Sequence, residues 1–330
     1  MKRTSYFILA AQLLNRGDNL PTDRQRFKES QNCHNFALVV LAVLVSLLLA
    51  GCQKPQPGDT DNAEISVRDD LFAYGVALGK VVEDDVEEAS GLVASQEQDN
   101  LFWTHNDSGD RARIFALSKT GDDRGTFNLK GVDVEDVEDI TRHEDTLFLA
   151  DIGDNDARRS QLTIYRFPEP RLDAEEDKIE AITPIRFRYP EGARDAETLM
   201  YDPLTDSLFI VTKRERQVRL YRLPAQVEDT DEVLEAEWLL EMPFRMIVAG
   251  DISADGMEVL LKTYNEVLYW KRQPNEPLAV TLSREPYFLP YETELQGESI
   301  AWEADGSAFF TLSEERDGTI EAEMVRYVRK

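Results

Sequence analysis

Three glutamates precede apolar runs at similar places in a repeating pattern. Glu138, Glu197 and Glu298 each begin such a run, and each run is followed by a turn and a second apolar run. Ser90 and Gly250 take the corresponding position in two further copies. Carboxylate, hydroxyl and backbone oxygens are the ligands that a hard cation with flexible coordination, such as Ca²⁺, prefers. If the five positions converge, they predict an oxygen-only calcium site.

The same glutamates have a second interpretation. Each can accept hydrogen bonds from backbone N–H groups of a neighbouring repeat without any metal, since recurring residues in repeat proteins often stabilise the repeat itself. Carboxylates held close together either raise one another's pKa or recruit a cation. Zinc is not indicated, because the chain after residue 52 has two histidines and no cysteine. The sequence leaves the metal and the structural interpretation open.

The repeat unit indicates which elements must position these residues. Its copies start at residues 90, 138, 197, 250 and 298, so the gaps are 48, 59, 53 and 48 residues. Each copy contains short runs rich in Val, Ile, Leu, Phe and Tyr between Asp-Gly, Asn and Pro turns. A unit of about fifty residues with four strands is typical of a β-propeller blade. We therefore expect an all-β propeller of five four-stranded blades, with six blades as the alternative.

The two ends of the propeller are expected to share one blade. The last copy, from Glu298 to Lys330, has 33 residues and room for three strands. Residues 65–89 supply 25 more and include a strand-like run from Leu71 to Val82. An N-terminal strand that completes the last blade would cover the edges that an open array exposes.

Polar residues follow the second strand of every copy and should meet at one face of the ring. One side of this face is acidic and the other carries cations, which fits a metal beside a phosphate or carboxylate ligand. Turn formation and solvated strand ends are the structural alternatives for the same residues. The predicted ligand-binding residues are His105, Asn106, Asp107, Asp151, Asp154, Asn155, Lys213, Lys262 and Glu314. The candidate catalytic residues among them are Asp107, Asp151, Lys213 and Lys262.

Charge and motifs exclude several classes of function. A formal net charge of −27 repels nucleic acid and attracts divalent cations. The sequence has no Gly-rich phosphate loop before a helix and no Gly-x-Ser-x-Gly nucleophile elbow. We expect a monomer whose partner is a small molecule or a protein of unknown identity, and not a nucleic acid.

The first 64 residues have the pattern of an export and anchoring segment. Residues 36–50 are fifteen residues without charge behind a basic stretch, which is typical of a secretory signal and short for a membrane span of about 20 residues. An uncleaved signal anchor is the alternative, and the long stretch before the apolar run is consistent with a start codon assigned too far upstream. We expect a signal peptide over 1–51, a lipidated cysteine and flexible spacer over 52–64, and one propeller domain over 65–330.

The quartet Leu49-Ala50-Gly51-Cys52 resembles the lipobox of bacterial lipoproteins. That resemblance implies acylation of Cys52, for example by palmitate, and a lipid anchor in a membrane. Because Gln53 and not aspartate follows the cysteine, it implies the outer membrane in a Gram-negative host. The propeller would then face the periplasm or the cell exterior.

The rest of the chain resembles two groups of propeller proteins. The stretches "WTHNDSGDRARIFAL", "VEDI", "ADIGDN" and "DAETL" are similar to a family of secreted bacterial propellers that is grouped with the phytase-esterase-like propellers. The axial positions also resemble the calcium-activated nucleotidases, which are five-bladed apyrases with an axial calcium held in the order Ser, Glu, Glu, Ser, Glu. This chain departs from that order at Gly250, where a backbone carbonyl would have to serve.

Together these resemblances imply a lipid-anchored propeller in the cell envelope. Its axis would hold a calcium-like ion, and the propeller would bind a ligand or a partner protein. The alternative is a calcium-dependent hydrolase of phosphate esters or anhydrides. In that case the metal and the lysines would neutralise phosphoryl charge while a carboxylate activates water.

Overall fold

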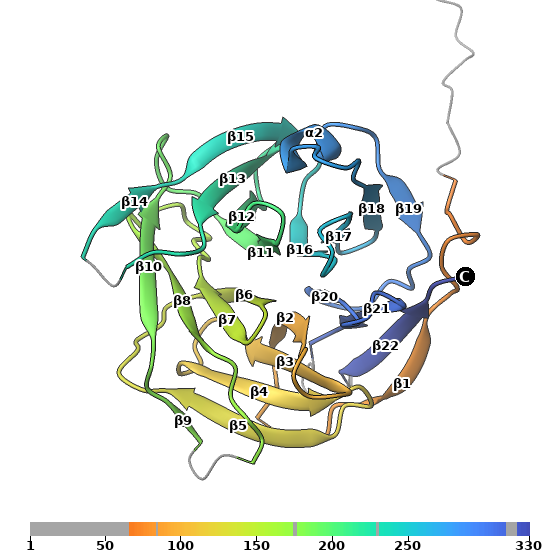
Figure 1. Ribbon diagram of the computed structural model, residues 1–330, viewed down its shortest axis with the longest axis horizontal. Helices are drawn as coiled ribbons and strands as arrows, with labels where there is room; N and C mark the ends of the chain where they lie inside the picture. Colours follow the sequence, from red (N-terminus) through yellow and green to blue (C-terminus); the bar gives the residue numbers. More distant parts are fainter. Residues whose placement is uncertain (1–65, 84, 174–176, 229–230, 315–321) are drawn as a thin grey trace, which may run out of the picture. The chain divides into compact units, whose positions relative to one another are not determined.

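Short apolar strands joined by tight turns build five sheets around a central axis (Figure 1). This computed structural model describes residues 66–83, 85–173, 177–228, 231–314 and 322–330. The predicted signal peptide, the lipidated Cys52 and the spacer lie outside the described residues. Within the described residues, no helix is long and apolar enough to cross a membrane.

Each sheet is one blade, and its strands follow one another from the axis outward. The first blade contains β2 (Ala89–Ala94), β3 (Leu101–Asn106), β4 (Arg113–Ser118) and β5 (Asp123–Leu129). The second contains β6 (Val137–His143), β7 (Thr146–Asp151), β8 (Leu162–Pro168) and β10 (Thr183–Arg188). The third contains β11 (Ala196–Asp202), β12 (Ser207–Thr212), β13 (Val218–Pro224) and β15 (Glu237–Met242).

The remaining two blades have the same order. The fourth contains β16 (Ile247–Ile252), β17 (Glu258–Thr263), β18 (Val267–Lys271) and β19 (Tyr287–Leu289), with the short helix α2 (Leu278–Leu282) before β19. The fifth contains β20 (Ser299–Trp302), β21 (Ala308–Leu312), β22 (Glu323–Val328) and β1 (Val76–Lys80). Two short strands, β9 (Lys178–Ile179) and β14 (Val233–Glu235), extend the first and second blades by parallel pairing at their outer edges.

The five-bladed prediction is confirmed, and so is the closure of the ring by an N-terminal strand. β1 pairs antiparallel with β22, so the last blade is assembled from both ends of the described chain. Phe72, just before β1, is fully buried and packs against Phe309 with ring centroids 5.3 Å apart. β1 therefore covers the outer edge of β22, which a three-stranded last blade would leave exposed.

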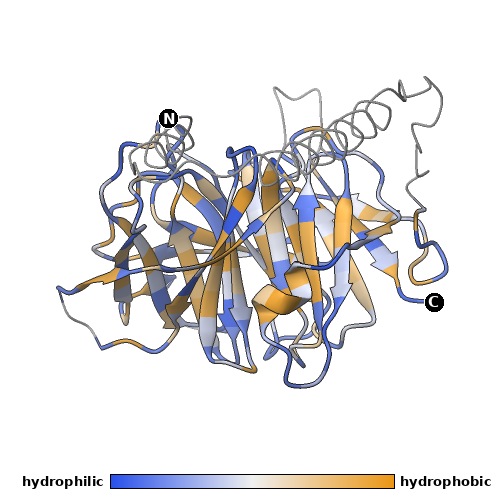
Figure 2. Cartoon of the chain, turned by 90° about the horizontal axis from the view of Figure 1, so that it is seen from above, coloured by the Kyte–Doolittle hydropathy of each residue, from blue (hydrophilic) through white to orange (hydrophobic). Residues whose placement is uncertain are grey.

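The hydrophobic core lies between neighbouring blades. Five clusters of buried side chains occupy the five blade interfaces, one cluster per interface. The innermost strands are buried along almost their whole length, whereas an outer strand such as β15 is largely exposed. Figure 2 shows hydrophobic colour along the strands and hydrophilic colour in most connecting loops. The blades therefore hold each other by burial of two-sided sheets, as expected from the near-continuous apolar runs.

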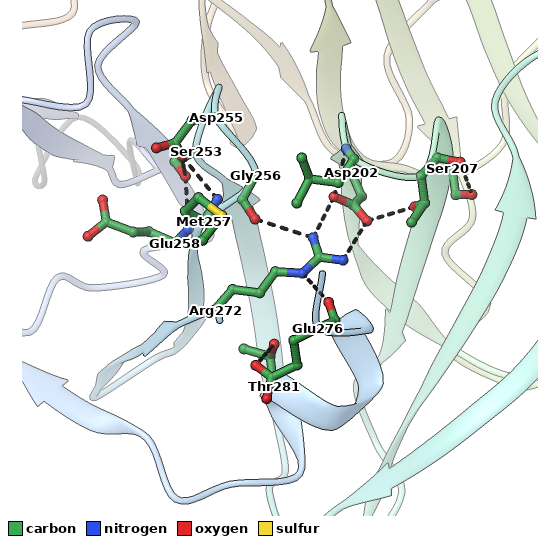
Figure 3. A network of polar contacts seen from close by, with 12 residues as sticks. Asp202, Ser207, Ser253, Asp255, Gly256, Met257, Glu258, Arg272, Glu276 and Thr281 are labelled. Carbon is green, nitrogen blue, oxygen red and sulfur yellow. Dashed lines mark hydrogen bonds and ion pairs between the residues drawn. The ribbon is translucent and has the colours of Figure 1, made fainter. Parts of the chain in front are cut away.

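A buried ion pair joins the third blade to the fourth (Figure 3). Arg272 Nη1 donates to Asp202 Oδ1 at 2.7 Å and Nη2 to Oδ2 at 3.2 Å, with both side chains at most 2 % exposed. Two further guanidinium donors reach the backbone oxygens of Glu276, at 2.7 Å, and Gly256, at 3.2 Å. With four of the five guanidinium donors engaged, the buried pair has geometry that helps to offset the cost of removing two charges from water.

Candidate metal centre

The innermost strands all begin at the same end of the axis, and we call this end the mouth. Two of the predicted axial residues lie there at equivalent β-bulges. Glu138 is the extra residue between Val137 and Asp139 in the pairing of β6 with β7, and Glu197 is its counterpart in the pairing of β11 with β12. A bulge redirects a side chain out of the regular alternation of a strand. The bulges thus position both glutamates at the mouth.

The structure corrects the predicted alignment of the fourth repeat. The bulge in β16 is at Val248, and Gly250 lies two residues further along, opposite Leu261. A Cβ added to Gly250 would come within 2.7 Å of Leu261 Cδ2 and 2.9 Å of Thr198 Cγ2. This glycine therefore allows close packing between the third and fourth blades, and the residue at the bulge position is an apolar valine.

Ser90 and Glu298 lie where the fifth blade meets the first. The Ser90 side chain donates to the backbone oxygen of Glu138 at 2.9 Å and is buried. The backbone of Ser90 forms an isolated parallel bridge with that of Glu298. Ser90 thus joins the backbones of the blades that carry two of the glutamates.

Five carboxylates gather at the mouth in two overlapping groups. Oxygens of Asp107, Asp136 and Glu138 lie within 4.8 Å of one another, and so do oxygens of Asp107, Glu298 and Glu314. We refer to these five residues as the carboxylate cluster. They come from the first, second and fifth blades, and Asp107 belongs to both groups.

Asp136 is the member that the sequence interpretation missed. It stands two residues before Glu138, in the segment that leads into β6. The spacing Asp136-Val137-Glu138 was the signal that could have found it. Its Oδ1 atom is buried and has no hydrogen-bond partner among the described residues.

The negative charge of the cluster is poorly compensated by the surrounding protein. Burial, followed by repulsion from neighbouring carboxylates, raises the pKa of Asp136 to about 7 and the pKa of Glu314 to about 8. The same two causes, in the same order, raise the pKa of Glu138 well above its ordinary value. Like charges held this close favour protonation or the capture of a cation.

Lys213 separates Glu197 from the cluster. Its Nζ forms an ion pair with Glu197 and lies 3.6 Å from Glu298 Oε1. The Tyr264 hydroxyl donates to Glu298, and Lys213 lies 5.4 Å from the centre of the Tyr264 ring. The third blade thus contributes Lys213 with its partner Glu197 and the fourth contributes Tyr264, while the other three contribute the carboxylates of the cluster.

Several predicted ligand-binding residues are engaged in local structure instead. Asp151 accepts the Asp136 N–H at 3.0 Å and pairs with Arg159 at 2.8 Å. Asp154 accepts the N–H groups of Arg158 and Arg159, both at 2.8 Å, as a turn residue does.

The amides and the remaining basic residues of the predicted mouth also have internal partners. Asn106 donates to the Asp85 backbone oxygen at 2.7 Å and to Asp110 at 2.9 Å, and Asn155 accepts from Arg214. Burial lowers the pKa of His105 to about 4, so its ring is neutral at pH 7. Lys262 is fully buried and donates to the Gly297 backbone oxygen.

A glycine beside the carboxylate cluster lets two of its side chains lie close to the backbone. Gly153 lies two residues after the end of β7, and a Cβ at this position would collide with Glu138 Oε1 and Asp136 Oδ2. A larger residue at this position would have to displace these carboxylates. Oxygen-only ligand sets with several carboxylates suit Ca²⁺, which accepts irregular geometry and six to eight oxygens.

Two aspartates, and not the axial glutamates of the described chain, accept hydrogen bonds from backbone N–H groups of the neighbouring blade. Asp139 accepts the backbone N–H of Leu199 in the next blade at 2.7 Å and the backbone N–H of Ile140 at 2.8 Å. Asp251 likewise accepts the backbone N–H of Trp302 in the next blade and the backbone N–H of Ile252, both at 2.8 Å. Burial raises the pKa of both carboxyl groups. Blade-to-blade capping and the carboxylate cluster are thus separate features.

Replacement of Asp139 by alanine should lower the free energy of unfolding by about 2–6 kcal/mol, because two buried N–H groups lose their acceptor at about 1–3 kcal/mol each. Chemical denaturation measures the change. The control is Asp145→Ala on the exposed turn between β6 and β7, which should be nearly neutral. A loss below about 1 kcal/mol for Asp139→Ala would show that these hydrogen bonds do not hold the blades together.

Solved structures with similar shape include a gluconolactonase from Xanthomonas campestris, with a TM-score of 0.48 and 8 % identity over 81 % of this chain and 94 % of that one. The WD40 repeats of RRP9 and the protein U3-55K each have a TM-score of 0.36 and 11 % identity, over 73 % of this chain and 67 % of theirs. No curated protein matches the sequence. A family model described as SdiA-regulated matches residues 69–258, more than half of the chain, and the protein therefore belongs to the SdiA-regulated family of β-propellers.

Proposed function

We propose that the protein is a ligand- or partner-binding propeller whose mouth is organised by a calcium-like cation. The observation that carries this proposal is the carboxylate cluster, in which five acidic side chains from three blades converge beside one lysine. Lys213 can offset one of these charges at most, and it is already paired with Glu197. A divalent cation would relieve the remaining repulsion.

The cation would act mainly through the loops that it joins. Asp107 follows β3, Asp136 precedes β6 and Glu314 follows β21, so an ion held at Asp107 would connect residues from three blades. When bound, it supplies positive charge at the centre of the mouth. These residues would then present a fixed surface to a ligand or a partner protein, which reduces the ordering cost of binding.

Binding is favoured over the calcium-dependent hydrolysis of phosphate esters or anhydrides. A hydrolase of this class needs cationic side chains that are free to contact the phosphoryl oxygens. Lys213 is paired with Glu197, and Lys262 is 0 % exposed beneath the mouth. The two lysines considered for phosphate contact are therefore engaged inside the protein.

The same proposal includes a location in the cell envelope. It is supported by the apolar run over residues 36–50 and the lipobox-like quartet that ends at Cys52. A lipid anchor at Cys52 and the polar spacer to residue 64 would attach the propeller to the outer membrane and keep it free to meet a partner.

Calorimetric titration of the purified, chelator-treated protein with calcium tests the metal proposal. We expect saturable binding that weakens at least tenfold in Glu298→Gln, since that change removes one charged ligand of the cluster while keeping its shape. Glu285→Gln on the exposed rim of the fourth blade is the matched control and should bind like the unchanged protein. A folded, metal-free sample that takes up no calcium would overturn the proposal.

A further inference from the structure

The other end of the axis holds a cavity that is separate from the carboxylate cluster. Its volume is about 280 Å³, and all five blades contribute to its wall. The wall residues stand at or just after the ends of β2, β6, β11, β16 and β20, whereas the carboxylate cluster lies where these strands begin. A six-residue strand such as β2 rises roughly 20 Å, which sets the separation of the two features.

Arg142, whose guanidinium group has one nitrogen without a partner among the described residues, lines this cavity. Arg142 at the end of β6 donates from Nε to the Ala94 backbone oxygen at 2.6 Å and from Nη1 to Gln96 Oε1 at 2.7 Å. Both acceptors are neutral, and no ion pair to Arg142 occurs among the described residues. Its Nη2 has no hydrogen-bond partner within the same part of the chain. Burial lowers the pKa of Arg142, so the positive charge would gain from an incoming anion.

A carboxylate lines the same cavity. Asp251 accepts one backbone N–H on each oxygen, and each oxygen keeps a second lone pair. The positive charge of Arg142 acts on Asp251 without a direct contact between them. The cavity therefore offers a donor group and an acceptor group at separate positions on its wall.

An aromatic pair forms a further part of the wall. His143 and Tyr201 stack with ring centroids 4.3 Å apart and an angle of 22° between the rings. The Tyr201 hydroxyl donates to Asp206 at 2.9 Å, which fixes the orientation of the ring. This stack belongs to two different blades and gives the cavity an apolar side.

We infer that this cavity binds a small carboxylic acid that also carries a hydrogen-bond donor, namely a hydroxy acid or an amino acid. The ligand carboxylate would accept a charge-assisted hydrogen bond from Nη2 of Arg142, the nitrogen that has no partner within the described chain. The hydroxyl or amino group would donate to Asp251, and the carbon chain would lie along the His143–Tyr201 stack. A multiply charged phosphate fits less well, because Asp251 would repel it. Ligand cavities usually start near 300 Å³, so the acid must be small.

Ligand-observed NMR titration tests this inference on the purified protein with chelator present, so that the metal centre does not contribute. The probes are L-lactate and L-serine, together with acetate, which lacks the donor, and ethanolamine, which lacks the carboxylate. At least one of lactate and serine should saturate in the millimolar range, as expected for ligands of so few atoms. It should bind at least threefold more tightly than acetate or ethanolamine. Equal binding of acetate would overturn the assignment of a donor group.

Variants assign the binding to this cavity. Arg142→Gln should weaken the bound probe about tenfold or more, since it replaces a charge-assisted hydrogen bond by a neutral one. Arg124→Gln, at the exposed start of β5, is the matched control and should bind normally. If Arg142→Gln fails to fold, the His143 ring resonances of the unchanged protein must shift on addition of the probe. Absence of saturation up to about 20 mM, unaltered binding by folded Arg142→Gln, or unshifted His143 resonances would overturn the inference.

Discussion

Replacement of Asp202 by alanine should lower the free energy of unfolding by about 3–5 kcal/mol, because it leaves the guanidinium of Arg272 buried without its counter-charge. The pair is among the most deeply buried of the described ion pairs, with side-chain exposures of 2 % and 0 %. It joins two blades, so the loss should appear in the cooperative unfolding of the whole ring. Urea denaturation at pH 7 measures the effect.

Two comparisons separate this effect from a general loss of contacts. Glu237→Ala removes the partner of Arg222 in an exposed pair and should cost at most about 1 kcal/mol. The double variant Asp202→Leu, Arg272→Met should recover most of the stability, because an apolar pair of similar size avoids burying charge. If Asp202→Ala costs no more than Glu237→Ala, the buried pair does not fasten the third blade to the fourth.

The metal-free protein should lose stability as the pH rises from 5 to 8. In the folded protein the pKa is about 7 for Asp136 and about 8 for Glu314, above the ordinary values of 3.8 and 4.5. A group whose pKa is raised by folding contributes stability below its unfolded pKa and loses it as the pH passes its folded pKa. With allowance for solvent screening of these partly exposed groups, the combined loss is on the order of 3 kcal/mol.

Calcium should reverse this loss at pH 8 and have little effect at pH 5, where protons occupy the ligand oxygens. At a concentration one hundred times its dissociation constant, a ligand that binds only the folded state adds about 2.7 kcal/mol. Thermal denaturation at both pH values, with chelator or with calcium, measures the four stabilities. A metal-free protein that is equally stable at pH 5 and pH 8, or a calcium effect that is the same at both, would contradict the account.

The fold was largely predictable because the blade repeat is a local pattern. Four apolar runs per unit and a fixed third position, such as Ile140 or Leu199, set the number of blades without any long-range information. The closure by β1 followed from a count of residues, since the last unit was too short for four strands.

The candidate site was predictable only in part, because bulges shift residues relative to a repeat. Asp139-Ile140 and Asp251-Ile252 have the same sequence and the same capping hydrogen bonds, so an alignment by residue type superposes them. Their strand registers nevertheless differ by two residues, and this displaced Gly250 from the mouth. Burial was equally invisible in the sequence, which is why Lys262 was expected at a surface that it does not reach.

Anomalous diffraction from crystals grown with calcium tests the central claim most directly. The account predicts a peak at the carboxylate cluster, at about 2.3–2.6 Å from an oxygen of Asp107, the residue that both groups share. The peak should be absent from crystals of Asp107→Asn that retain the fold. A map without a peak at this end of the axis, from protein that binds calcium in solution, would contradict the account and place the ion elsewhere.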